Sequence, residues 1–67
     1  MNSLERLVYM ANQIAANLAR EADPAAATAD HIRRYWDPRM KRMIAEHGND
    51  GLCPAAAAAV ASLKAAG

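Results

Sequence analysis

The fold is decided by the stretch DPAAATADHIRRYWDP, residues 23–38, which begins and ends with the pair Asp-Pro. An aspartate just before a helix can accept hydrogen bonds from the first free amides, and proline fits the first helical position, where no amide partner is needed. Proline also disfavours helical geometry at the residue before it, so the chain should turn at Asp37. The two pairs therefore predict a helix at residues 24–36 and the start of another at Pro38.

Upstream of this stretch, apolar residues recur at intervals of three and four, which is the spacing that lines one face of a helix. The apolar positions are Leu4, Leu7, Val8, Ala11, Ile14, Ala15 and Leu18. The opposite face is polar, with Glu5, Arg6, Asn12, Asn17 and Arg20. Asn2 followed three residues later by Glu5 approximates a capping box. We expect a helix at residues 3–21.

Downstream, a third helix is expected at residues 38–47, with two methionines and Ile44 on its apolar side. Gly48 can end this helix in a left-handed conformation. The polar residues 49–51 are typical of a turn.

The last segment is rich in alanine and begins with a weaker helix signal, Cys53-Pro54. Alanine has the highest helix propensity, but it offers little side chain to bury. We therefore expect a helix at residues 54–66 that packs against the rest of the chain mainly through Val60 and Leu63. We expect this helix to order on a partner.

The composition describes a small chain with a thin core. Sixty-seven residues with a net charge of +1 allow one helical domain, residues 1–67, and leave no room for a large active site. Half of the hydrophobic residues are alanine, and a chain near this length buries only about 60% of the surface that its unfolded form exposes. No stretch alternates as a strand does, so we predict an all-α domain of three to four short helices that is marginal without a partner.

The residues form no recognisable catalytic, cofactor-binding or metal-binding set. The single cysteine, Cys53, excludes an internal disulfide, and with His31 and His47 it provides too few ligands for a structural zinc site. A nucleophilic role for Cys53 would need a base beside it, so a cap or packing role is expected for Cys53. The two histidines are expected to be helix-surface or packing residues rather than ligands. The charged amino-terminal stretch argues against a signal peptide, and no run is apolar enough to span a membrane, so a reducing cytoplasm is expected.

Charged and aromatic side chains are most concentrated in residues 33–42, which contain five of the eight cations and two aromatic residues. Arginine and aromatic side chains are the commonest anchors of protein interfaces. We therefore predict a partner-binding surface made of Arg33, Arg34, Tyr35, Trp36, Asp37, Arg39 and Met40. Tyr35, Trp36 and Met40 would be its apolar anchors, and the three arginines would donate charge-assisted hydrogen bonds. Asp37 would hold the corner between the two helices.

Three other interpretations compete with this surface. In the first, Trp36 fills the core and the cations are an ordinary solvated face. In the second, the cations bind nucleic acid phosphates in a helix-turn-helix outline. Seven acidic residues nearly balance the eight cations, however, whereas a dedicated DNA-binding module is normally strongly basic. In the third, the chain is a free-standing regulatory protein or helical homo-oligomer.

A family resemblance is carried by residues 10–15 (MANQIA), residues 29–40 (ADHIRRYWDPRM) and the sequence Gly-Leu-x-Pro before an alanine-rich tail. Together, in this order and spacing, they resemble the delta subunit of NAD-dependent formate dehydrogenase over most of the chain. The combination of these segments is specific to the family, whereas no single segment is. The chain departs from the family at Cys53, where a serine is expected. Because serine caps a helix better, fraying at this helix start is expected.

The resemblance implies a non-catalytic accessory subunit of a cytoplasmic complex that oxidises formate to carbon dioxide and reduces NAD. In such a complex the molybdenum or tungsten pterin, the iron-sulfur clusters and the FMN belong to the larger alpha, beta and gamma subunits. None of them is expected in this chain. The implied partners are these large subunits, and the alpha subunit is the first expected. The implied role is to support assembly or stability of the complex. The resemblance carries over no catalytic residue.

Overall fold

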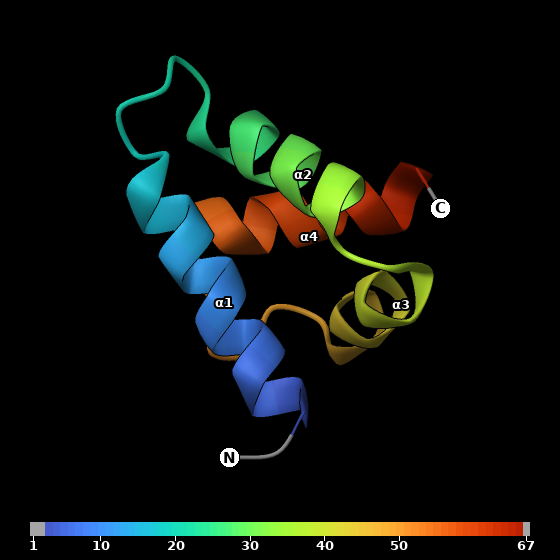
Figure 1. Cartoon of the computed structure of the whole chain (residues 1–67). Helices are drawn as coiled ribbons and strands as arrows, with labels where there is room; N and C mark the ends of the chain where they lie inside the picture. The colour runs from blue at the N-terminus through green and yellow to red at the C-terminus, as the bar shows by residue number, and fades with distance from the viewer. Residues whose placement is uncertain (1–2, 67) are drawn as a thin grey trace.

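Four α-helices make up the described part of the chain, residues 3–66 of this computed structural model. They are α1 (Ser3–Asn17), α2 (Pro24–Tyr35), α3 (Pro38–His47) and α4 (Pro54–Ala66). No strand occurs in these residues, so the all-α prediction is confirmed. α4 packs most extensively against α2 and also contacts α1 and α3 (Figure 1). The last three helices begin and end within one residue of the predicted positions.

α1 is shorter than the sequence predicts. It ends at Asn17 rather than at residue 21, and a turn follows in which the Ala19 N–H donates to the Ala16 carbonyl at 3.3 Å. Residues 19–23 are all exposed, so no buried side chain holds a longer helix against the core. The predicted capping residue Asn2 lies outside the described residues.

Both Asp-Pro pairs start helices as predicted. The Asp23 carboxylate accepts a hydrogen bond from the amide three residues later at 3.1 Å, and the Asp37 carboxylate accepts one from the Met40 amide at 2.8 Å. Gly48 ends α3 with a φ of 85°, a conformation that favours glycine. These local signals fix the limits of α2 and α3.

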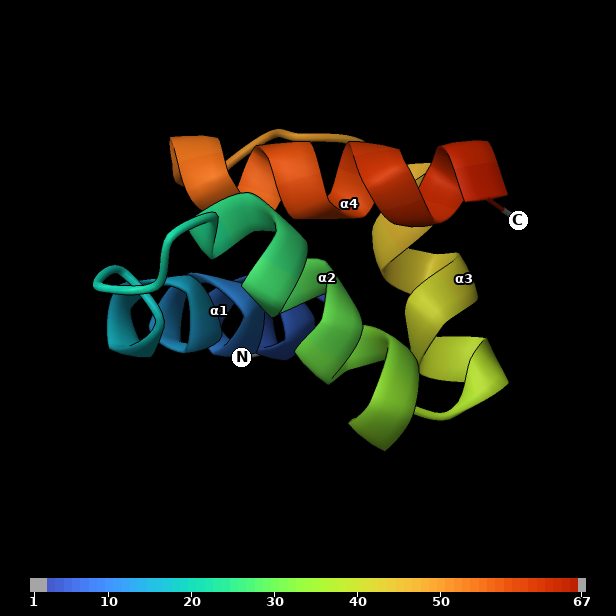
Figure 2. The ribbon, with the colours of Figure 1, turned by 90° about the horizontal axis from the view of Figure 1, so that it is seen from above.

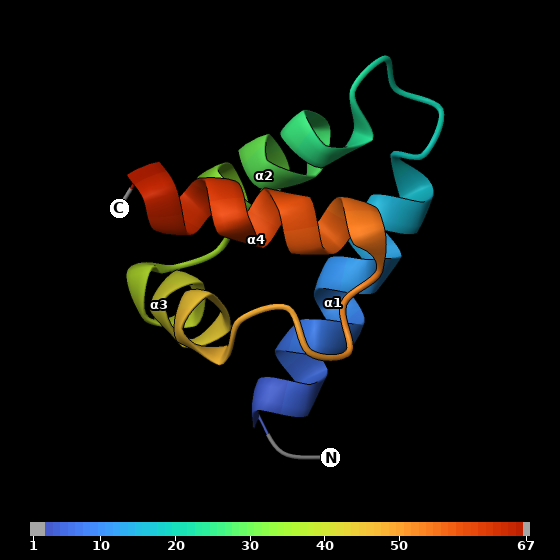
Figure 3. The ribbon, with the colours of Figure 1, turned by 180° about the vertical axis from the view of Figure 1, so that it is seen from behind.

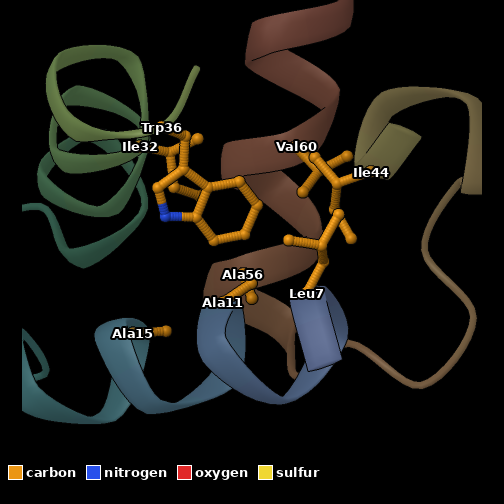
Figure 4. Close-up of a cluster of buried hydrophobic side chains, with 8 residues drawn as sticks. All are labelled: Leu7, Ala11, Ala15, Ile32, Trp36, Ile44, Ala56 and Val60. Carbon is orange, nitrogen blue, oxygen red and sulfur yellow. The ribbon is translucent and has the colours of Figure 1, made fainter. Parts of the chain in front are cut away.

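The hydrophobic core draws on all four helices. Its buried residues are Leu7, Ala11, Ala15, Ile32, Trp36, Ile44, Ala56 and Val60. In Figure 4 the indole ring of Trp36 points from the end of α2 into the space among Leu7, Ile44 and Val60, which come from the other three helices. Trp36 is 5% exposed and Ile44 is fully buried. One large ring therefore joins α2 to each of its neighbours.

The contact between α2 and α4 is built from small side chains. Apart from Ile32 and Val60, the residues of α2 and α4 that are at most 2% exposed are all small: Thr28, Ala29, Ala56 and Ala59. The Thr28 hydroxyl donates to the Pro24 carbonyl at 2.7 Å, so its polar atom is satisfied within α2. Figure 2 shows α4 as a layer over α1 and α2. We name this set of four buried small residues the small-residue seam.

The seam corrects the expectation that α4 frays at its start and needs a partner to order. α4 begins at Pro54, and the Ala57 N–H donates to the Cys53 carbonyl at 2.8 Å. The sequence predicts that α4 packs through Val60 and Leu63. Val60 is buried and Leu63 is half-buried. The alanines dock α4 as well, because their small side chains let the two backbones approach closely.

Asn12 is assigned by the sequence to the polar face of α1, but the structure gives it a specific role. Its side-chain amide donates to the Gly51 carbonyl at 2.9 Å, and its side-chain oxygen accepts from the Cys53 N–H at 2.8 Å. Figure 3 shows the segment that precedes α4 running beside α1. Asn12 therefore fixes the start of α4 from a position about 40 residues earlier in the chain.

Replacing Asn12 with alanine is expected to lower the free energy of unfolding by about 1–2 kcal/mol, because the half-buried Cys53 N–H loses its partner. Urea unfolding followed by circular dichroism measures the change. Asn12→Asp keeps the acceptor and removes the donor, so it should lose only part of this stability. Gln13→Ala, at the exposed neighbouring position, is the control. Equal midpoints for Asn12→Ala and Gln13→Ala would contradict the role of Asn12.

Candidate partner-binding surface

The corner between α2 and α3 is held by two backbone hydrogen bonds and one side-chain cap. The Trp36 N–H donates to the Ile32 carbonyl at 3.0 Å, after which the backbone of Trp36 becomes extended. The Asp37 carboxylate and carbonyl then accept from the Met40 and Lys41 amides at 2.8 and 3.1 Å. Asp37 holds the corner, as the sequence predicts.

Trp36 does not lie on the predicted surface. Its side chain is 5% exposed and fills the core, so the prediction of an exposed tryptophan anchor is wrong. The competing interpretation of Trp36 as a core residue is confirmed. The physical reason is that a core poor in large side chains gains most hydrophobic free energy by burying its largest ring. Met40 is half-buried and also packs against the core, so it offers only part of its side chain to a partner.

Tyr35 is the aromatic residue that the corner presents to solvent. Its side chain is 72% exposed, and its ring centroid lies 4.7 Å from that of His31 one helical turn earlier. This contact holds the tyrosine ring against α2 without covering it. Tyr35 is therefore the apolar anchor that the corner offers at its surface.

The three predicted arginines are all exposed, and Arg33 and Arg34 have different surroundings. Arg34 pairs with Asp30, with Nε 3.1 Å from Oδ2, and both side chains are more than half exposed. Such a pair contributes on the order of 0–1 kcal/mol. Arg33 instead lies beside α3, where the Lys41 Nζ donates to its carbonyl at 3.4 Å. Neighbouring helical positions point about 100° apart, so residues that are adjacent in the sequence spread around α2.

A groove of about 500 Å³ lies between the end of α2, α3 and the end of α4. It is lined by Arg33, Pro38, Lys41, Arg42, Ala45, Leu63 and Lys64. We name it the cationic groove, because every charged residue that lines it is a cation. The sequence could not indicate Leu63 and Lys64 as part of this region, since α4 reaches it only through the fold.

A second hollow of about 400 Å³ lies between the start of α1 and the turn after α3. It is lined by Leu4, Glu5, Val8, His47, Asp50 and Gly51. Its carboxylates are Glu5 and Asp50. The two hollows share no lining residue, so these carboxylates and the cations of the groove line different parts of the surface.

His47 ends α3, and Cys53 immediately precedes α4. The His47 Nε2 lies 2.8 Å from the Asp50 carbonyl oxygen, and Cys53 is a half-buried free thiol whose amide is held by Asn12. Within residues 3–66, no three His, Cys, Asp or Glu side chains gather into a group that could hold a metal ion. No helix in this part of the chain combines the length and apolar character that a bilayer crossing requires.

Comparison with known proteins identifies the family. A family model described as the NADH-dependent formate dehydrogenase delta subunit FdsD matches residues 6–60. No curated protein and no solved structure matches the chain significantly. The matched residues run from the start of α1 into α4 and include Asn12 and the whole corner between α2 and α3. The match spans most of the chain and confirms the resemblance drawn from the sequence motifs, so the chain belongs to the delta-subunit family of NADH-dependent formate dehydrogenases.

Proposed function

We propose that this chain is a non-catalytic accessory subunit of a cytoplasmic formate dehydrogenase complex, in which it supports assembly or stability. The complex oxidises formate to carbon dioxide and transfers the electrons to NAD. The observation that carries the proposal is the family match over residues 6–60. The larger subunits hold the molybdenum or tungsten pterin, the iron-sulfur clusters and the FMN of this complex.

The proposed mechanism is physical rather than chemical. Tyr35 supplies an exposed aromatic anchor at the corner, and Arg33, Arg34 and Arg39 supply donors to acceptors on a large subunit, alpha being the first to test. Planar guanidinium groups and aromatic rings give large contact area at modest entropy cost. Asp37 supports the site indirectly, because its cap on α3 sets the angle at which these side chains are presented.

The proposal is tested by isolating a tagged form of the full chain from formate-grown cells in moderate salt and identifying the bound proteins by mass spectrometry. Recovery of the large formate dehydrogenase subunits is the expected result. The metal and flavin content of the enzyme, with and without this chain, then separates a role in cofactor insertion from a role in stability. Recovery of the chain alone, or with nucleic acid, would contradict the proposal.

Reversing two charges at the corner, Arg33→Glu with Arg34→Glu, is expected to weaken binding to the large subunits by about tenfold or more, because interface cations become repulsive. Helicity of the free chain should not change, since both side chains are exposed. Binding is measured by titration of the large subunits, and helicity by circular dichroism.

The matched control is Arg6→Glu with Arg20→Glu, which changes the net charge equally at exposed positions away from the corner. It should bind as the wild type does. Equal weakening by both double variants would mean that overall charge, rather than the corner, governs binding. A collapse of helicity in the corner variant would mean that its arginines are structural.

A further inference from the structure

We propose that the cationic groove is a second docking site, which receives an acidic helical segment of a large formate dehydrogenase subunit. The inference rests on the proposed accessory role and goes beyond it, because it names a second surface and the chemistry of its occupant. The corner and the groove share only Arg33 among the predicted partner-binding residues.

The first step is the local charge. Four of the eight cations of the chain line the groove, and no carboxylate lines it. None of these four forms an ion pair with any residue in the described range. Because the chain as a whole carries only +1, this excess is local: three of the cations come from the cation-rich residues 33–42, and the fold adds Lys64 from α4. An occupant with several carboxylates complements the groove.

The second step is the apolar part of the lining. Pro38, Ala45 and Leu63 lie among the cations, and the methylene stems of lysine and arginine add further apolar surface. Leu63 is only half-buried although it packs against the core. A phosphate backbone would leave this apolar lining unused. An amphipathic helix places an apolar side chain on the lining and carboxylates on either side of it.

The third step is size. The volume of about 500 Å³ lies within the range of about 300–1,000 Å³ that is typical of ligand sites. It accommodates a few side chains from one or two helical turns rather than a whole domain. The occupant is therefore a short segment that adds to the contact made at the corner.

The test begins with formate dehydrogenase prepared without this chain, to which the full-length chain is added. Arg42→Glu with Lys64→Glu leaves the corner unchanged and should weaken binding by about tenfold or more. Ala45→Leu fills the groove without changing its charge and should also weaken binding severalfold. The control remains Arg6→Glu with Arg20→Glu. Because these changes lie at exposed or half-buried positions, the melting temperatures should agree within a few degrees.

A chemical readout follows from the position of the lysines. The sequence contains two lysines, Lys41 and Lys64, and both line the groove. A carbodiimide joins an amine directly to a carboxylate in contact with it, so it should link these lysines to one acidic segment of a large subunit. Peptide mass spectrometry identifies that segment.

The outcomes separate this inference from the proposed function. If the wild-type chain does not bind the large subunits, both fail. If it binds and the groove variants bind equally well, the groove inference fails and the accessory role stands. Lysine cross-links only to a second copy of the chain would also overturn the inference. The inference would also be overturned by a wild-type chain that binds a labelled DNA duplex, if the groove variants lose this DNA binding but still bind the large subunits normally.

Discussion

Replacing Trp36 with alanine is expected to lower the free energy of unfolding by about 3–5 kcal/mol. The indole is 5% exposed and contacts a core that contains few other large side chains. Small domains have total stabilities of roughly 0.05–0.15 kcal/mol per residue, so this loss removes at least about a third of the stability of the free chain. Urea unfolding followed by circular dichroism measures it.

Tyr35→Ala is the matched control, because it removes the neighbouring aromatic side chain, which is 72% exposed. It should change the stability of the free chain by less than about 1 kcal/mol while weakening binding to the large subunits. Because Trp36 is the only tryptophan, its fluorescence in the wild type should shift to longer wavelength on unfolding. A Trp36→Ala variant with an unchanged urea midpoint would contradict the core position of the indole.

Ala59→Leu is expected to destabilise the chain by about 1–3 kcal/mol, because the added carbons must displace the atoms packed around a fully buried position. Ala59 is fully buried in the small-residue seam. The change leaves helix propensity high, so a loss of stability reports packing rather than helix formation. Thermal and urea unfolding of the free chain measure the effect.

Ala58→Leu provides an unusually close control, since it makes the same substitution at the next residue, which is exposed. It should leave the stability within about 0.5 kcal/mol of the wild type. If Ala59→Leu proves as stable as Ala58→Leu, the two helices do not pack closely and the seam is wrong.

The sequence predicts those features that depend on neighbouring residues. Each Asp-Pro pair contains its own cap and its own helix start, so the limits of α2 and α3 could be predicted without knowing the rest of the fold. The positive φ of Gly48 is predictable for the same reason. The end of α1 was not predictable from local signals, because the apolar pattern continues to Leu18. The helix ends because the residues after Leu18 are exposed.

The features that depend on distant residues could not be predicted. Asn12 resembles any polar residue on a helix face until the fold brings Gly51 and Cys53 to it. Trp36 beside several arginines is consistent with both an interface anchor and a core residue, and only the packing of Leu7, Ile44 and Val60 from three other helices shows that it belongs to the core. The cationic groove was not predictable because Lys64 comes from the far end of the chain.

The small-residue seam also sets how the stability of this chain responds to temperature. The heat capacity of unfolding rises with the apolar area exposed and falls with the polar area exposed. Alanine methyl groups add little apolar area, whereas helices bury many peptide groups. The heat capacity change should therefore lie below the usual value of roughly 12–15 cal/mol/K per residue. The resulting stability curve is shallow, so the chain keeps nearly the same modest stability from cold to warm conditions.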